Sequence, residues 1–136
     1  MAEILVNAIT TGEKQTTLRA RPSTEPAIAA VARGSWRAKD RDAISSSGYV
    51  VDTLEAALWC VSRADNFSEA VLFAANLADD ADTVAAVTGQ IAGALWGLSG
   101  IPAHWIDRLA WQKEIERKGR QLIAARDSAE SPSGAG

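Results

Sequence analysis

Three carboxylates lie within four residues of this sequence, at Asp79, Asp80 and Asp82, and Thr83 follows them directly. Two interpretations of this cluster are open. In the first, the acids cap and solvate the start of a helix, where Asp80 or Asp82 accepts hydrogen bonds from free backbone N–H groups. In the second, Asp80 and Asp82 turn toward one centre and Thr83 adds a neutral oxygen, a ligand set that suits Mg²⁺ or Mn²⁺. An EF-hand loop is excluded, because the residue eleven positions after Asp80 is Ile91.

Other reactive side chains are scarce. Cys60 is the only cysteine and His104 the only histidine, so neither an internal disulfide nor a Cys/His zinc site can form. A Ser-His-Asp triad would depend on His104 alone. We expect Cys60 to be a small buried hydrophobe and His104, beside Trp105, to stand at a helix start rather than act as a base. The catalytic residue therefore stays unassigned.

The elements that would position the acidic cluster are helices. Apolar residues recur at three- and four-residue steps from Val50 to Val61, which predicts a helix preceded by a polar loop at 45–48. A second helix is predicted to begin at Ser68, whose hydroxyl would cap its first turn. Because the second helix is apolar on nearly every side, we expect it to lie at the centre of a bundle.

A third helix is predicted from about Asp82 to Gly97, so that the acidic cluster stands at its start. Ala85, Gly89, Gly93 and Gly97 lie four residues apart and form a stripe of small residues on one face. Each glycine lowers helix propensity by roughly 1 kcal/mol relative to alanine. We therefore expect the stripe to serve close packing with a neighbouring helix. Phosphate binding is not expected, because the stripe lies inside the helix and not at its start.

The N-terminal part, residues 1–44, is the hardest to interpret. Residues 4–9 fit either a strand or a buried helical turn, and residues 24–36 suggest a short helix that ends at Gly34. No other segment shows the sustained alternation of a strand. The predicted class is therefore all-α.

Chain length and the C-terminal sequence indicate the domain organisation. The 136 residues, 47% of them hydrophobic, suffice for one domain with its own core, which we predict over residues 1–126. Pro102 opens a predicted fourth helix that continues through the charged segment before residue 127. Residues 127–136 are small and polar and are predicted to form a disordered tail.

Charge and hydropathy exclude several classes of protein. The formal net charge is −3, so a general binder of nucleic-acid phosphates is not expected. No run of about 18 apolar residues is present, which excludes a membrane-spanning helix. The first residues lack a positively charged segment and include Glu3, which argues against a signal peptide and favours a cytoplasmic protein.

Three consecutive segments resemble the ADP-ribosylglycohydrolase family, which includes the dinitrogenase reductase-activating glycohydrolases. They read GYVVDTLEAALW from Gly48, NLADDADTVAAVTGQIAGALWG from Asn76, and IPAHW up to Trp105. Together they cover nearly half of the chain in the family's order and spacing. The most specific piece is the Asp-x-Asp-Thr that begins at Asp80 and precedes the glycine-rich helix.

The resemblance implies a compact orthogonal helical bundle, of which this sequence would represent about half. It also implies hydrolysis of the bond between ADP-ribose and a modified protein side chain or small molecule, at a site for two ions, normally Mg²⁺ or Mn²⁺. Asp80, Asp82 and Thr83 fall on the family's metal-ligand positions, and Gly48 and Tyr49 lie where the family lines its substrate cleft.

The same resemblance limits what the chain could do by itself. The family completes its metal site from an N-terminal Thr-Asp-Asp segment, which does not occur in this sequence. Because each Mg²⁺ takes about six oxygens, Asp80, Asp82 and Thr83 alone would bind metal weakly. Three hypotheses follow: a hydrolase completed by an oligomer or a complementing chain, an inactive truncated module that binds ADP-ribose or a nucleotide, and a self-associating protein such as a dimer. The five tryptophans fit large apolar surfaces that association would cover.

Overall fold

A computed structural model describes residues 1–77 and 79–130 of the chain. Within these residues every regular element is helical, with eight α-helices and three short 3₁₀ turns, so the predicted all-α class is confirmed. The chain divides into two compact units, one of Met1–Ile101 and one that begins at Pro102. The sequence instead predicts a single domain over residues 1–126.

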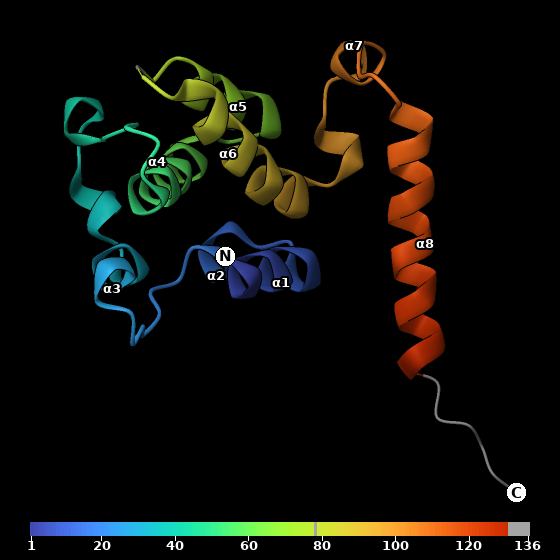
Figure 1. Cartoon of the computed structure of the whole chain (residues 1–136), viewed down its shortest axis with the longest axis horizontal. Helices are drawn as coiled ribbons and strands as arrows, with labels where there is room; N and C mark the ends of the chain where they lie inside the picture. Colours follow the sequence, from blue (N-terminus) through green and yellow to red (C-terminus); the bar gives the residue numbers. More distant parts are fainter. Residues whose placement is uncertain (78, 131–136) are drawn as a thin grey trace, which may run out of the picture. The chain divides into compact units, whose positions relative to one another are not determined.

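Three helices form the middle of the first unit: α4 (Val50–Arg63), α5 (Phe67–Ala75) and α6 (Ala81–Trp96). Each of them contacts the other two, and α1 (Ala2–Thr11) also packs on α6 (Figure 1). As a result α6 supplies a large part of the core. Its buried residues are Val84, Thr88, Ile91, Ala92 and Leu95.

The sequence predicts that the stripe of small residues on α6 packs closely against a neighbouring helix, and the structure does not show such packing. A Cβ built at Gly89 or Gly97 would meet no atom within 4 Å, and one at Gly93 would reach only Phe67 Cε2, at 3.9 Å. The prediction of close helix packing along this stripe is therefore wrong. Gly97 instead ends α6 with a φ of 69°, a conformation that glycine adopts without a steric penalty.

Helix α5 begins one residue earlier than predicted, at Phe67, and has a different cap. The side-chain Oδ1 of Asn66 accepts hydrogen bonds from the Glu69 N–H at 2.9 Å and from the Ser68 hydroxyl at 2.8 Å. The Glu69 carboxylate in turn accepts from the Asp65 N–H at 2.8 Å. Asn66, and not Ser68, is thus the N-cap, and side chains satisfy two backbone N–H groups near the helix start.

The prediction that α5 lies at the centre of the bundle is also wrong. Leu72 and Phe73 are 49% and 40% exposed, and the buried side chains of α5 come only from Phe67, Ala70 and Ala74. Helix α5 is therefore apolar on nearly every side but buried on only one part of its surface. The central position belongs to α6.

The N-terminal part is helical, including residues 4–9, which lie within α1. Helix α2 (Lys14–Thr17) follows, and α3 (Pro26–Arg33) ends at Gly34 as predicted, with a φ of 97°. Two 3₁₀ turns then lead toward α4: η1 (Ser35–Ala38) and η2 (Arg41–Ala43). A third, η3 (Leu98–Gly100), follows α6.

The second unit contains two helices where the sequence predicts one. Helix α7 (Ala103–Ile106) follows Pro102, and α8 (Gln112–Glu130) begins after Trp111, whose φ of 61° interrupts the helix. Residues 127–130 belong to α8 and not to a tail, and residues 131–136 lie outside the described part of the chain. Among the described helices, none is long and apolar enough to cross a membrane.

Candidate metal centre

The acidic cluster stands at the start of α6, where it meets the loop that precedes α4. The backbone N–H of Asp80 donates to the carbonyl oxygen of Ser46 at 3.0 Å. Gly48 has a φ of 78°, and a Cβ built on it would lie 2.6 Å from Asp80 Oδ2. Only a glycine therefore leaves room for the Asp80 carboxylate in its observed position.

Side-chain hydrogen bonds on both sides of the contact between Gly48 and Asp80 hold the loop before α4 in place. The carboxylate of Asp52, in the first turn of α4, accepts hydrogen bonds from the Ser45 hydroxyl at 3.0 Å and the Ser47 hydroxyl at 2.8 Å. On the other side, Arg41 Nη2 donates to the carbonyl oxygen of Asn76 at 2.7 Å. Three segments of the chain thus converge on the start of α6.

Within the cluster, Thr83 Oγ1 donates to Asp80 Oδ1 at 2.7 Å. This hydrogen bond, followed by one with the Asp82 side chain, lowers the pKa of the Asp80 carboxyl below its ordinary value. Asp80 occupies the N-cap position of α6. Asp80, Asp82 and Thr83 thus stand together at one helix start, an arrangement that fits both the capping and the metal-binding interpretation of the sequence.

The chemistry of these three side chains fits a hard divalent cation, because carboxylate and hydroxyl oxygens are the ligands that Mg²⁺ and Mn²⁺ prefer. The set is small. Among the residues that the structure describes, no group of three His, Cys, Asp or Glu side chains is placed to hold a metal ion. Two carboxylates and one hydroxyl leave about half of the positions of an octahedral ion to water, substrate or another polypeptide.

Asp79 lies beside the cluster but is exposed and has a φ of 60°, which fits the expectation of a solvated acid. Tyr49, predicted to line a substrate cleft, is the N-cap residue of α4 and is 58% exposed. Its backbone N–H lies 3.4 Å from the Ser47 hydroxyl, to which it donates. Of the two predicted substrate residues, Gly48 is thus the one in contact with Asp80.

A cavity of about 340 Å³ adjoins this site, and both Gly48 and Thr83 line it. Sequence reasoning missed Thr53, whose side chain is buried and also faces this cavity. Within the described part of the chain, the Thr53 hydroxyl has no hydrogen-bond partner. Its signal in the sequence was a hydroxyl next to Leu54, on the apolar face of the helix predicted at 50–61. The remaining lining is apolar: Met1, Ile28, Val50, Val51, Leu54 and Val87.

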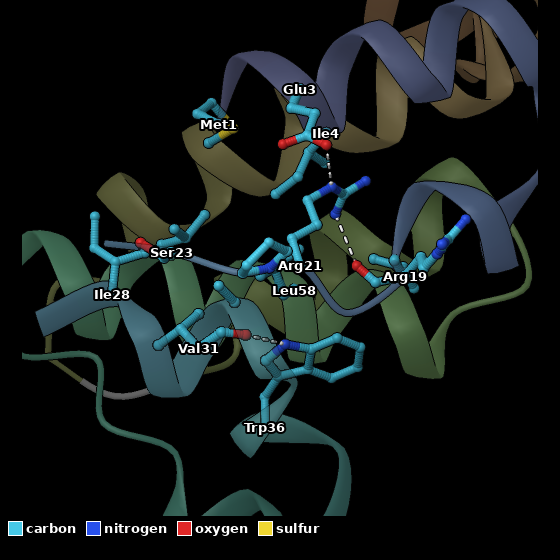
Figure 2. A pocket seen from close by; sticks show the side chains of 14 residues that line it. Met1, Glu3, Ile4, Arg19, Arg21, Ser23, Ile28, Val31, Trp36 and Leu58 are labelled. Atoms are coloured by element: carbon cyan, nitrogen blue, oxygen red, sulfur yellow. Dashed lines mark hydrogen bonds and ion pairs between the residues drawn. The ribbon is translucent and has the colours of Figure 1, made fainter. Parts of the chain in front are cut away.

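A second cavity, of about 250 Å³, lies between α1 and α3 and is lined by the residues drawn in Figure 2. Its most buried cation is Arg21, which contacts Glu3 at 3.3 Å and donates to the carbonyl oxygens of Arg19 and Thr17 at 3.0 and 2.9 Å. Because the Glu3 carboxylate neutralises the charge of Arg21, we assign no ligand to this cavity.

The two other reactive side chains behave as expected where the structure tests them. Cys60 is fully buried, and burial raises the pKa of its thiol to about 12, so it packs as a small hydrophobe. His104 is exposed in α7, in the second unit, with its ring edge against Trp105 at a centroid distance of 6.2 Å.

Comparison with known proteins now decides the family. The sequence model of the ADP-ribosylglycohydrolases matches residues 1–132, which is almost the whole chain. The chain belongs to the ADP-ribosylglycohydrolase family. The resemblance carried by Asp80, Asp82 and Thr83 is therefore confirmed at the level of the family.

Two relatives in this family are named ADP-ribosylarginine hydrolase Tri1. The one from Pseudomonas putida (strain GB-1) is 50% identical over 117 residues, which are 85% of this chain and 32% of the relative. The one from Serratia proteamaculans (strain 568) is 59% identical over 90 residues, which are 66% of this chain and 25% of the relative.

A third relative is the ADP-ribosyl-[dinitrogen reductase] glycohydrolase of Rhodospirillum rubrum. It is 36% identical over 81 residues, which are 58% of this chain and 28% of the relative. The chain thus spans about a third or less of the length of these family members.

Proposed function

We propose that this chain supplies one side of an Mg²⁺ or Mn²⁺ site at which an ADP-ribosyl linkage, such as that of ADP-ribosylarginine, is hydrolysed. The observation that carries the proposal is the position of Asp80 at the start of α6, where Thr83 donates to its carboxylate and Gly48 leaves room for it. Membership of the family and the printed names of its relatives support the choice of reaction.

In this proposal Asp80 and Asp82 hold the cation, and Thr83 fixes the orientation of the Asp80 carboxylate through its hydroxyl. An aspartate carboxylate is ionised near neutral pH, the state in which it can bind a cation, and the Thr83 hydrogen bond favours that state further by lowering the pKa of Asp80. When bound, a divalent cation supplies Lewis acidity that orients substrate oxygens and stabilises developing charge. Gly48 leaves space for Asp80, and a mostly apolar cavity adjoins the site at Gly48 and Thr83.

The small ligand set also bears on the partners of the chain. Since Asp80, Asp82 and Thr83 provide only three of about six oxygens for one ion, we propose that an oligomer or a complementing chain supplies further acids and the general base. Two ions, as the resemblance implies, would need still more. A cytoplasmic location is part of the same proposal, supported by the single reduced and buried Cys60.

The first test is binding of Mn²⁺ to the purified chain, measured by electron paramagnetic resonance, which detects weak as well as tight binding. We expect the Asp80→Ala/Asp82→Ala double variant to lose the bound signal. Asp79→Asn is the matched control, because Asp79 is exposed and asparagine tolerates its positive φ. Equal Mn²⁺ binding by the wild type and the double variant would contradict the proposed site.

The second test concerns activity. From the ligand count we expect the isolated chain to release little ADP-ribose from ADP-ribosylarginine in the presence of Mg²⁺, compared with the spontaneous rate. Rapid Mg²⁺-dependent turnover by the pure chain, abolished in the double variant, would show that its site is complete and would overturn the need for a partner.

A second candidate function is the binding of ADP-ribose or a nucleotide without hydrolysis. It is favoured by the cavity of about 340 Å³ that Gly48 and Thr83 line beside the acidic cluster. Calorimetry with ADP-ribose in the absence of metal distinguishes the two: binding that survives the Asp80→Ala/Asp82→Ala substitutions supports the binding module.

A further inference from the structure

A groove of about 660 Å³ lies at the other end of α4 from the candidate metal centre. Helix α2, the 3₁₀ turn η1 and the last residues of α4 form its walls. With fourteen residues at about 1.5 Å each, α4 places this groove roughly 20 Å from the loop at Gly48. A small ligand at the metal centre cannot also fill it. The groove is lined by Lys14, Gln15, Leu18, Trp36, Arg37, Ser62 and Arg63.

Three of these residues are cations, and their described hydrogen bonds go to neutral carbonyl oxygens. Lys14 Nζ donates to Ala64 at 2.6 Å, and Arg37 Nη1 donates to Arg33 at 3.1 Å. Arg63 Nη2 donates to Arg37 at 3.3 Å, which brings the Arg63 head group against the turn that carries Arg37. The three positive charges therefore converge on one hollow.

Within the described part of the chain, no carboxylate forms an ion pair with these three cations. The ion pairs found in the described part of the chain involve Arg21, Lys39, Arg41, Arg117 and Lys118, and none includes a cation of the groove. Carbonyl oxygens satisfy hydrogen bonds but carry no net charge. The groove is thus a local positive site on a chain whose formal net charge is −3.

The groove also keeps free donors and an apolar floor. A guanidinium has five N–H donors and an ammonium three, so the described bonds leave several for a ligand. The Arg37 guanidinium carbon lies 4.6 Å from the centroid of the Trp36 ring, a cation–π contact that ties the head group to this side of the groove. Leu18 and Trp36 add apolar surface at the base.

We propose that this groove binds an acidic segment of a partner protein. Several carboxylates on a short extended peptide match three cations gathered in one hollow, while the apolar floor suits the aliphatic stems of glutamates. Nucleic acid fits less well, because phosphate binding draws on many cations along a stripe and the rest of this chain is acidic. The inference does not depend on the metal centre.

The test uses fluorescence anisotropy of a fluorescein-labelled deca-glutamate peptide at low ionic strength. We expect saturable binding that weakens as salt is added, because salt screens exposed charges. A glycine-serine peptide of equal length is expected not to bind. Absence of deca-glutamate binding, or equal binding of both peptides, would overturn the proposal.

The decisive variant is Gln15→Glu, which places a negative charge in the groove. Gln15 is exposed and has no described hydrogen bond, and glutamate is favourable in the first turn of a helix, so folding is preserved. Gln90→Glu is the matched control, since Gln90 is exposed on α6 and the change in net charge is the same.

We expect Gln15→Glu to weaken deca-glutamate binding roughly fivefold or more, and Gln90→Glu to change it by less than about twofold. Equal effects of the two variants would locate the binding elsewhere and contradict the proposal. A poly-thymidine strand that binds more tightly than deca-glutamate would reassign the groove to nucleic acid and would equally overturn it. All of these measurements leave the proposed hydrolase function untouched.

Discussion

At the scale of single residues, the contact between Gly48 and Asp80 is the one on which the candidate site depends most. Gly48→Ala is expected to lower the free energy of unfolding by roughly 1 kcal/mol through backbone strain, and also to weaken Mn²⁺ binding, because the new Cβ displaces the Asp80 carboxylate. Thermal melts and Mn²⁺ titration measure the two effects.

Gly12→Ala provides the control for this substitution. Gly12 has a φ of 63°, similar to that of Gly48, but a Cβ there would meet no atom within 4 Å. The strain is expected in both variants and the loss of Mn²⁺ binding only in Gly48→Ala. If Gly12→Ala weakened Mn²⁺ binding as much, the effect would come from general destabilisation and not from contact with Asp80.

Burial of Cys60 leads to a pH-dependent prediction. The thiolate is the reactive form of cysteine, and burial raises the pKa of this thiol from 9.0 to about 12. We expect Cys60 to resist a thiol reagent at pH 8 in the folded chain and to react fully in denaturant. Between about pH 9 and 12 the unfolded state holds fewer protons than the folded state, so the free energy of unfolding falls as pH rises. Fast reaction of native protein at pH 8 would contradict this description.

Spacing within one short segment is enough to predict that Asp80, Asp82 and Thr83 stand at one helix start, whereas their role as metal ligands stays a prediction. Asp80, Asp82 and Thr83 needed no knowledge of the rest of the chain. The carbonyl of Ser46 and the carboxylate of Asp52 could not be predicted, because they reach the site only when a loop before α4 folds against the start of α6.

At the scale of elements, the cap of α5 provides a direct test of how this helix begins. Asn66→Ala removes the acceptor of the Glu69 N–H and of the Ser68 hydroxyl. The expected loss is about 1 kcal/mol of stability, typical of an N-cap change, measured by urea unfolding. Ser68→Ala is the comparison, and a larger loss there than in Asn66→Ala would restore Ser68 as the cap.

The helices themselves were predicted more reliably than their environments. Periodicity indicated α4 and the end of α3 correctly because those signals are local. The central position predicted for α5 was wrong, since burial depends on which neighbours a helix finds. Leu72 and Phe73 stay exposed on α5, while the glycine-containing α6 contacts three other helices.

At the scale of the whole molecule, the core belongs to the first unit. Every buried residue of the described chain lies between Ile4 and Leu95. Truncation after Ile101 is therefore expected to shift the thermal midpoint by less than about 5 °C, as followed by circular dichroism. Loss of cooperative unfolding on truncation would contradict a self-sufficient first unit.

In contrast, Ile91→Ala in the intact chain is expected to lower the free energy of unfolding by roughly 3 kcal/mol, because Ile91 is fully buried.

The contact between Gly48 and Asp80 also bears on how this family can diverge. Because a side chain at position 48 and a carboxylate at position 80 compete for the same space, the two positions cannot change independently. We expect them to covary: homologues that replace the glycine carry a shorter or differently oriented residue in place of the aspartate. Such paired replacement would identify, from sequences alone, the family members that have lost this half of the candidate metal site.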